Sequence, residues 1–275
     1  MKEILKKFLF LRHMYEYAQK QIYGTQIFIN YIKKIIFKQY FKFFPCSLKM
    51  VDIGGGNFVR FGWKNLDYYS GHYGYKSIFV DINHNLFGKK ELPFKSNSVD
   101  LFYSSHTFEH IPNIYCQHIF NEIYRSLKNN GIVRITLPDF DLYYKSYGRN
   151  DKNFYRNFPY REIHKNFLKA FATAKISDVS IKELKKNFKK LSQEEFANFY
   201  TNTIDLSTQT MNPSNHINWW TYEKMEKLLI KAGFNKNNIY RSLPQQSLSP
   251  HMRGTGNNGF DIRHTKISLF VEAIK

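Results

Sequence analysis

The chain has 275 residues, of which 43% are hydrophobic and 18% aromatic, and a formal net charge of +19. This composition excludes a disordered protein, which would have few aromatic side chains and little apolar surface to bury. The length allows one α/β domain with an added extension or insertion, since single domains commonly reach about 250 residues. The positive charge comes mainly from scattered lysines, which favours an ordinary basic surface over a dedicated phosphate-binding face.

Cysteine spacing and apolar runs exclude several classes of protein. Only Cys46 and Cys116 are present, without the spacing of metal ligands. We therefore predict neither a disulfide framework nor a metal site, and we expect a reducing, cytoplasmic compartment. Basic residues interrupt every apolar run near the N-terminus before it reaches the roughly 18 residues that a membrane span needs. We expect neither a transmembrane helix nor a secretory signal.

Residues 1–47 are predicted to form two basic amphipathic helices. Phe28, Ile32, Ile35 and Ile36 recur at helical spacing, with lysines between and after them. Three roles stay open for this apolar face: it covers the sheet, it closes the active site, or it contacts a membrane surface peripherally.

Residues 48–139 show short apolar runs that end in Gly, Asp or Ser-rich turns, which is typical of βαβ units. The predicted strands are 49–53, 64–67, 77–81, 99–104 and 131–137. A helix is predicted over 118–127, with Asn130 and Gly131 as its stop signal.

Residues 140–214 contain no strand-like run and are predicted to be a helical insertion that caps the active site. Residues 215–275 then return to the sheet. Thr221 is the expected N-cap of a helix that Gly233 ends, and two strands follow at about 238–242 and 266–274. The expected architecture is an α/β domain formed by residues 48–139 and 215–275.

A glycine-rich turn, Asp52-Ile53-Gly54-Gly55-Gly56, directly follows the first predicted strand. Glycine lets the backbone approach a ligand closely, so this placement indicates a nucleotide-type site. A dinucleotide site needs G-x-G-x-x-G opening a helix. Here the third glycine is missing and residues 57–62 leave little room for a helix, which argues against a dinucleotide site.

Three further segments follow the glycine turn in order. They are Gly62-Trp63-Lys64-Asn65-Leu66-Asp67, the stretch from Leu92-Pro93-Phe94 to His106 with Glu109-His110, and the stretch from Glu122 to Gly131. Together with the turn they resemble class I S-adenosylmethionine-dependent methyltransferases. The resemblance is strong over 48–139 and moderate over 216–275, and it is closest to a group found in glycan and secondary-metabolite biosynthesis.

This resemblance implies a Rossmann-like, mostly parallel seven-stranded sheet with an antiparallel C-terminal strand. It also implies S-adenosylmethionine as the cofactor and S-adenosylhomocysteine as the product. The residues that it assigns to the cofactor are Asp52, Gly54, Gly55 and Gly56 for the methionine part, Asp67 for the ribose, Asn85 and Leu86 for the adenine, and Ser104 at the end of the fourth strand. In a rival register, 76–80 is the second strand and Asp81 is the ribose ligand.

Methyl transfer to a hydroxyl needs a base close to the methyl group. Ligands of such sheets lie beyond the carboxyl ends of the strands, which favours His106 as this base. His216 is the second candidate, and His251 and His264 stay open. His110, in the Glu109-His110 pair, is interpreted as structural.

The expected acceptor is a small molecule, namely a hydroxyl or amine of a saccharide or nucleotide-linked sugar of surface polysaccharide biosynthesis. Aromatic rings and guanidinium groups of the insertion suit such a ligand, although the rings could instead pack the cap. These residues are Tyr143, Tyr144, Tyr147, Phe154, Tyr155, Tyr160, Arg149, Arg156 and Arg161. An RNA methyltransferase and a non-catalytic partner protein are the alternatives. Nucleic acid is the less favoured partner, because no RNA-binding module is recognisable.

Overall fold

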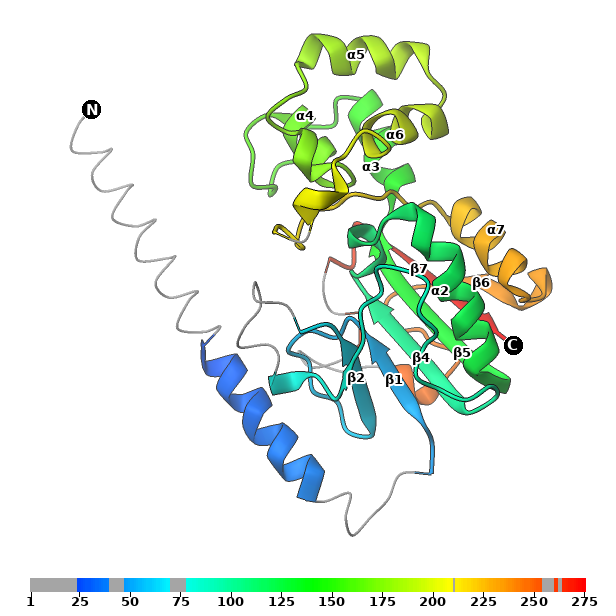
Figure 1. The fold of residues 1–275 in the computed structure, drawn as a ribbon. Helices are drawn as coiled ribbons and strands as arrows, with labels where there is room; N and C mark the ends of the chain where they lie inside the picture. The colour runs from blue at the N-terminus through cyan, green and yellow to red at the C-terminus, as the bar shows by residue number, and fades with distance from the viewer. Residues whose placement is uncertain (1–23, 40–46, 70–77, 210, 254–259, 262–263) are drawn as a thin grey trace.

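A computed structural model describes residues 24–39, 47–69, 78–209, 211–253, 260–261 and 264–275. Its centre is a seven-stranded sheet of order β3-β2-β1-β4-β5-β7-β6 (Figure 1). The strands are β1 (Met50–Ile53), β2 (Trp63–Asp67), β3 (Ile82–Asn83), β4 (Val99–Ser105), β5 (Leu127–Pro138), β6 (Ile239–Arg241) and β7 (Ser268–Ile274). Strand β7 is antiparallel to both of its neighbours, and the other pairs are parallel. The predicted Rossmann-like sheet is confirmed.

Two predicted boundaries in this sheet are wrong. The strand expected at 77–81 lies instead at 82–83, because the chain joins β2 only where Asp81 N donates to Asn65 O and His84 N donates to Asp67 O. Asn130 and Gly131 do not end a helix: they lie inside β5 at an irregular point of its pairing with β4. A Cβ on Gly131 would lie 2.9 Å from Lys128 O, so the close backbone approach explains this glycine.

Helices α2 (Asn113–Ser126) and α7 (Tyr222–Ala232) pack beside each other against one face of the sheet (Figure 1). Apolar side chains of both helices meet those of β4 and β5 in the main core. The predicted ends of α7 are confirmed, since Thr221 Oγ1 accepts from Lys224 N and Gly233 adopts φ 118°. The core therefore fixes β4 and β5 from one side.

The opposite face of the sheet is held by a buried charge network. The Arg134 guanidinium on β5 lies 2.5 Å from Asp261 Oδ2 and 3.2 Å from Glu272 Oε1, and all three side chains are buried. Tyr103 Oη donates to Asp261 Oδ1 at 3.0 Å. The segment before β7 is thereby attached to the middle of the sheet.

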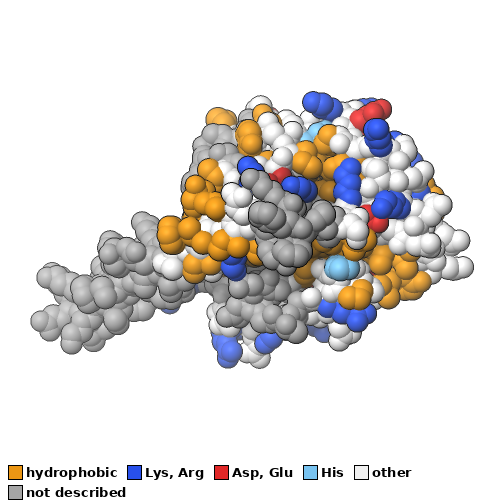
Figure 2. Space-filling model, turned by 90° about the horizontal axis from the view of Figure 1, so that it is seen from below, with side chains coloured by type: hydrophobic (Ala, Val, Ile, Leu, Met, Phe, Trp, Pro, Cys, Tyr) orange, Lys and Arg blue, Asp and Glu red, His pale blue; other side chains and the backbone are white. Residues whose placement is uncertain are grey.

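Residues 24–39 form a helix that contacts the loop between β1 and β2. Asn30 Nδ2 donates to Asn57 O, and the rings of Phe37 and Phe61 meet edge to face. The predicted apolar face does not cover the sheet, because its side chains are exposed: Phe28, Ile32, Ile35 and Ile36. Seen from below in Figure 2, this side of the molecule shows hydrophobic side chains beside lysine and arginine. The other predicted N-terminal helix lies outside the described residues.

No helix among the described residues is both long enough and apolar enough to cross a membrane.

The predicted insertion is helical and lies beyond the carboxyl ends of the parallel strands (Figure 1). Its helices are α3 (Phe140–Gly148), α4 (Ile163–Lys169), α5 (Ile181–Lys190) and α6 (Gln193–Thr201). They enclose an aromatic core of their own, in which Phe167, Phe171 and Phe196 are fully buried.

That aromatic core accounts for most of the rings expected to bind an acceptor. Tyr143 and Tyr155 are buried inside it, and Tyr144, Tyr147 and Phe154 pack against it. Of the two roles left open for these rings, the structure gives the buried pair that of packing the insertion, since burial there uses their surfaces. The three arginines of this region stay exposed: Arg149, Arg156 and Arg161.

The charge network yields a stability prediction. Arg134→Met should lower the free energy of unfolding by about 3–5 kcal/mol, because Asp261 and Glu272 would stay buried without their cation. Urea denaturation measures this change. Glu162→Gln, which removes the exposed Glu162–Lys165 pair, is the control and should leave the midpoint almost unchanged. An equally small effect of both substitutions would contradict the prediction.

Candidate active site

The glycine turn after β1 needs glycine for two separate reasons. Gly54 and Gly56 adopt φ 71° and 58°, a region that L side chains rarely enter. A Cβ on Gly54 would also lie 2.3 Å from Thr107 Oγ1, whereas a Cβ on Gly56 would meet no atom within 4 Å. The turn is therefore packed against the end of β4 at Gly54 and open at Gly56.

Asp67 ends β2 and is joined to the open part of this turn. Its Oδ2 accepts from Gly56 N at 2.9 Å, and its Oδ1 accepts from Tyr68 N at 2.7 Å. A carboxylate oxygen has two lone pairs, so each of the two Asp67 oxygens can accept a second hydrogen bond. The carboxylate and the glycine turn form one cradle, whose carboxylate oxygens can accept further hydrogen bonds.

Asp81 lies apart from this cradle. Its Oδ2 accepts from Asn65 N, and its Oδ1 lies 2.9 Å from Lys34 Nζ of the N-terminal helix. Asn85 is exposed and accepts from Phe87 N, while Leu86 packs against the main core. Of the two alternative ribose ligands, Asp67 is the one that accepts from the glycine turn.

Asp52 is buried at the end of β1 and forms an ion pair with Arg60. Burial raises the pKa of Asp52 to about 6, although the Arg60 charge opposes this shift. The guanidinium also lies over the rings of Phe260 and Tyr103, at 4.5 and 4.9 Å from the ring centroids. The sequence analysis missed Arg60, although its place between a glycine turn and the second strand was a usable signal.

The side chain of Ser104 does not point to solvent. Its hydroxyl donates to Ile53 O at 3.0 Å, and the side chain is buried. This bond holds the carboxyl ends of β1 and β4 together.

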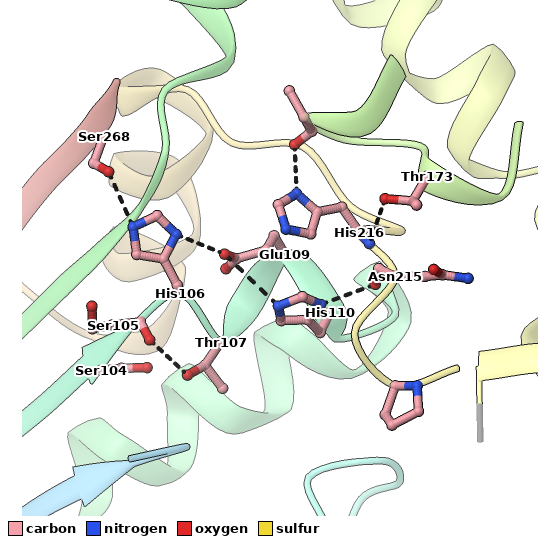
Figure 3. Close-up of polar contacts among 12 residues, drawn as sticks. Ser104, Ser105, His106, Thr107, Glu109, His110, Thr173, Asn215, His216 and Ser268 are labelled. Carbon is pink, nitrogen blue, oxygen red and sulfur yellow. Dashed lines mark hydrogen bonds and ion pairs between the residues drawn. The ribbon is translucent and has the colours of Figure 1, made fainter. Parts of the chain in front are cut away.

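His106 follows β4 directly and is held at both ring nitrogens (Figure 3). Nδ1 lies 3.0 Å from Glu109 Oε1 and Nε2 lies 3.1 Å from Ser268 Oγ. His264 packs beside it, with ring centroids 5.2 Å apart. The backbone of His106 has φ 52°, a costly conformation for this residue type that is often found at functional sites.

Glu109 is the buried centre of this region. One of its oxygens, Oε1, accepts from His106, while Oε2 has no hydrogen-bond partner among the described residues. Burial alone would raise the pKa of Glu109, but the His106 hydrogen bond and the charges of His106, His110 and His216 lower it to about 2. Glu109 is therefore a carboxylate at neutral pH.

His110 and His216 approach Glu109 from the other side (Figure 3). Their rings lie 4.8 Å apart between centroids. Each Nδ1 lies 3.0 Å from a backbone carbonyl, which belongs to Asn215 for His110 and to Ala170 for His216. A carbonyl only accepts, so each Nδ1 donates, and in the neutral imidazole Nε2 is the nitrogen that carries the lone pair. Burial lowers the pKa of His216 to about 4.

The remaining histidine candidate, His251, is exposed in the short helix Pro250–Met252 and lies outside this group. His106, His110 and His216 thus gather around Glu109, and His264 joins them through His106. No signal in the sequence predicted that His110 and His216 meet, because 105 residues separate them in the chain.

Comparison with known proteins places this site in context. Residues 72–135 match the model of a methyltransferase domain. None of the curated proteins compared with the sequence matches it.

Several solved structures are similar at low identity. A SAM-dependent methyltransferase of Archaeoglobus fulgidus is 12% identical, with 90% of this chain and 94% of that chain covered and a TM-score of 0.42. A presumed O-methyltransferase of Nostoc punctiforme is 14% identical, with 87% of this chain and 55% of that chain covered and a TM-score of 0.38. Human N-acetylserotonin methyltransferase in complex with SAM is 13% identical, with 82% of this chain and 47% of that chain covered and a TM-score of 0.37. The chain spans about half the length of the Nostoc and human proteins.

The packing of the glycine turn yields a matched pair of variants. Gly54→Ala should lower the free energy of unfolding by about 2–4 kcal/mol, from the positive φ and the clash with Thr107. Gly56→Ala should cost only the backbone strain, about 1–2 kcal/mol. Denaturant unfolding measures both. Adding Thr107→Ala should recover part of the loss in Gly54→Ala, and equal losses for the two alanines would refute this account of the turn.

Residues 72–135, which contain β3, β4, α2 and part of β5, thus resemble a methyltransferase domain, and S-adenosylmethionine is the cofactor of such a domain.

Proposed function

We propose that this protein transfers a methyl group from S-adenosylmethionine to a hydroxyl or amine of a small acceptor. The acceptor class is a saccharide or nucleotide-linked sugar of surface polysaccharide biosynthesis. One observation carries the proposal: the glycine turn, Asp67 and His106 follow the adjacent strands β1, β2 and β4 at their carboxyl ends. Ligands of open α/β sheets bind at this edge.

The described residues fit the cofactor. The carboxylate of Asp67, which accepts from Gly56 N, would hold the ribose by accepting hydrogen bonds from its hydroxyls. Asp52 and Arg60 offer opposite charges for the ammonium and carboxylate of the methionine part, and Arg60 Nε has no partner among the described residues. Asn85 and Leu86 are assigned to the adenine. When bound, the cofactor supplies a methyl group on a positively charged sulfur.

His106 is the base in this proposal. Glu109 is ionised and only accepts, so His106 Nδ1 carries a proton and Nε2 offers its lone pair. A histidine oriented by a buried carboxylate follows the logic of hydrolase triads. Ser268 Oγ, now 3.1 Å from Nε2, also lies 2.9 Å from His264 O. Because this hydroxyl donates to His264 O, the acceptor's oxygen would replace Ser268 Oγ beside Nε2 before its proton is transferred.

The insertion closes the same edge of the sheet. Backbone N–H groups of Ile217 and Asn218 donate to Glu109 O at 2.8 and 3.1 Å, which attaches the returning segment to the site. A lid in this position excludes water and orients the acceptor. The saccharide class itself rests on the resemblance of the sequence.

The role of Asp67 can be tested by cofactor affinity. Asp67→Ala should weaken binding of S-adenosylmethionine more than about tenfold, or 1.4 kcal/mol, because charge-assisted hydrogen bonds are lost. Asp81→Ala is the matched control and should leave the affinity unchanged. Isothermal titration calorimetry measures both dissociation constants. The reverse pattern would give the ribose role to Asp81, and absent binding to folded wild-type protein would favour the non-catalytic partner.

The role of His106 can be tested by turnover. Transfer of labelled methyl into a panel of nucleotide sugars and polysaccharide fragments first identifies the acceptor. His106→Ala should then reduce turnover by about 10²–10⁴-fold at unchanged cofactor affinity, the range of general-base catalysis. His251→Ala, at an exposed position, is the control. Near-normal turnover of His106→Ala would assign the base elsewhere, and label incorporated only into RNA would refute the saccharide acceptor.

A further inference from the structure

We propose that Glu109, His110 and His216 bind one divalent transition-metal ion at the carboxyl end of β4. The role we give the ion rests on the proposed function, whereas the binding itself is decided by separate measurements. Glu109 and His110 come from the short helix Phe108–His110, and His216 comes from the segment that returns from the insertion.

The three side chains converge on one point (Figure 3). One ligand atom from each lies within 4.8 Å of the others. Bonds of about 2.0–2.2 Å to an ion would place such atoms roughly 3–3.5 Å apart. Ligand atoms that now lie up to 4.8 Å apart would have to approach each other by about 1–2 Å to complete the site.

Both histidines already have the tautomer that a metal ion requires. The Nδ1 of His110 donates to Asn215 O, and the Nδ1 of His216 donates to Ala170 O. Histidine ligands in proteins almost always donate their second nitrogen to a carbonyl or a carboxylate, which fixes the ring and frees the other nitrogen. The two carbonyl groups that orient these rings belong to different segments of the chain.

The carboxylate of Glu109 supplies an independent observation. Its Oε1 accepts from His106, but its Oε2 is buried without a hydrogen-bond partner among the described residues. A buried carboxylate oxygen without a partner is costly, and such atoms are rare in native proteins. A bound cation would satisfy Oε2 and balance the negative charge.

The donor set determines the class of ion. Two imidazole nitrogens and one carboxylate oxygen suit Zn²⁺, Mn²⁺, Fe²⁺ or Co²⁺, whereas Mg²⁺ and Ca²⁺ prefer oxygen ligands. Three protein ligands leave at least one coordination position open, as in catalytic sites.

An open position beside His106 suits the acceptor hydroxyl. A metal ion that binds this oxygen makes its proton more acidic. The O–H bond breaks as the proton passes through one water molecule to His106 Nε2, which lies on the side of the ring away from Glu109, and the oxygen forms a bond to the methyl carbon. The C–S bond breaks at the same time, and its electron pair remains on sulfur. The Glu109 carboxylate would then both contact the ion and orient the base.

Metal binding is tested on tag-free protein stripped with a chelator. Titration calorimetry with Zn²⁺ and Mn²⁺, and visible absorption with Co²⁺, should show one ion per chain and a raised melting temperature. Glu109→Gln and His216→Gln should each weaken binding at least tenfold, and His251→Gln should not change it. Circular dichroism checks the fold of each variant. If Glu109→Gln does not fold, the affinity of His216→Gln alone decides the test.

Two outcomes of these binding measurements overturn the inference. Absence of stoichiometric binding to the stripped wild-type protein would refute the site, and binding of Mg²⁺ alone would refute the class of ion. Cofactor binding measured without metal separates the two proposals. Binding of S-adenosylmethionine without any ion binding would refute only the metal site, and ion binding without cofactor binding would refute only the proposed function.

Discussion

The buried carboxylate of Glu109 is the constraint on which the candidate site depends. Its side chain orients His106 and faces His110 and His216, while its backbone carbonyl accepts from Ile217 N and Asn218 N. A buried negative charge needs such compensation, since an isolated carboxylate in an apolar interior is strongly disfavoured. One residue therefore joins the end of β4 to the segment that returns from the insertion.

A second connection joins the cofactor side of the site to the sheet. Gly54 is packed under Thr107 at the end of β4, and Gly56 N donates to Asp67 at the end of β2. The Ser104 hydroxyl on β4 donates to Ile53 O on β1 and so connects these two strand ends. Three adjacent strand ends are thus held in register by hydrogen bonds that do not require a ligand, which is the preorganisation that methyl transfer needs.

Much of the fold and part of the site could be predicted from the sequence. Strand periodicity and the turn residues located β1, β2, β4 and β7, and they placed Asp67 and His106 at strand ends. The two-residue strand β3 carries too little periodicity to be located, and Asn130-Gly131 serves a close backbone approach that looks like a helix end in sequence. The grouping of His110 with His216 depends on how the insertion folds back, which local patterns do not encode.

The insertion also takes part in the site itself. His216 is oriented by Ala170 O, and its backbone N and O bond to Thr173. Both partners lie next to the aromatic core of the insertion, so packing there controls the position of His216 relative to Glu109. Under the proposed function, the lid and a residue of the reactive group would thus belong to one packed unit. A change of acceptor specificity through this insertion would therefore also alter the geometry around Glu109.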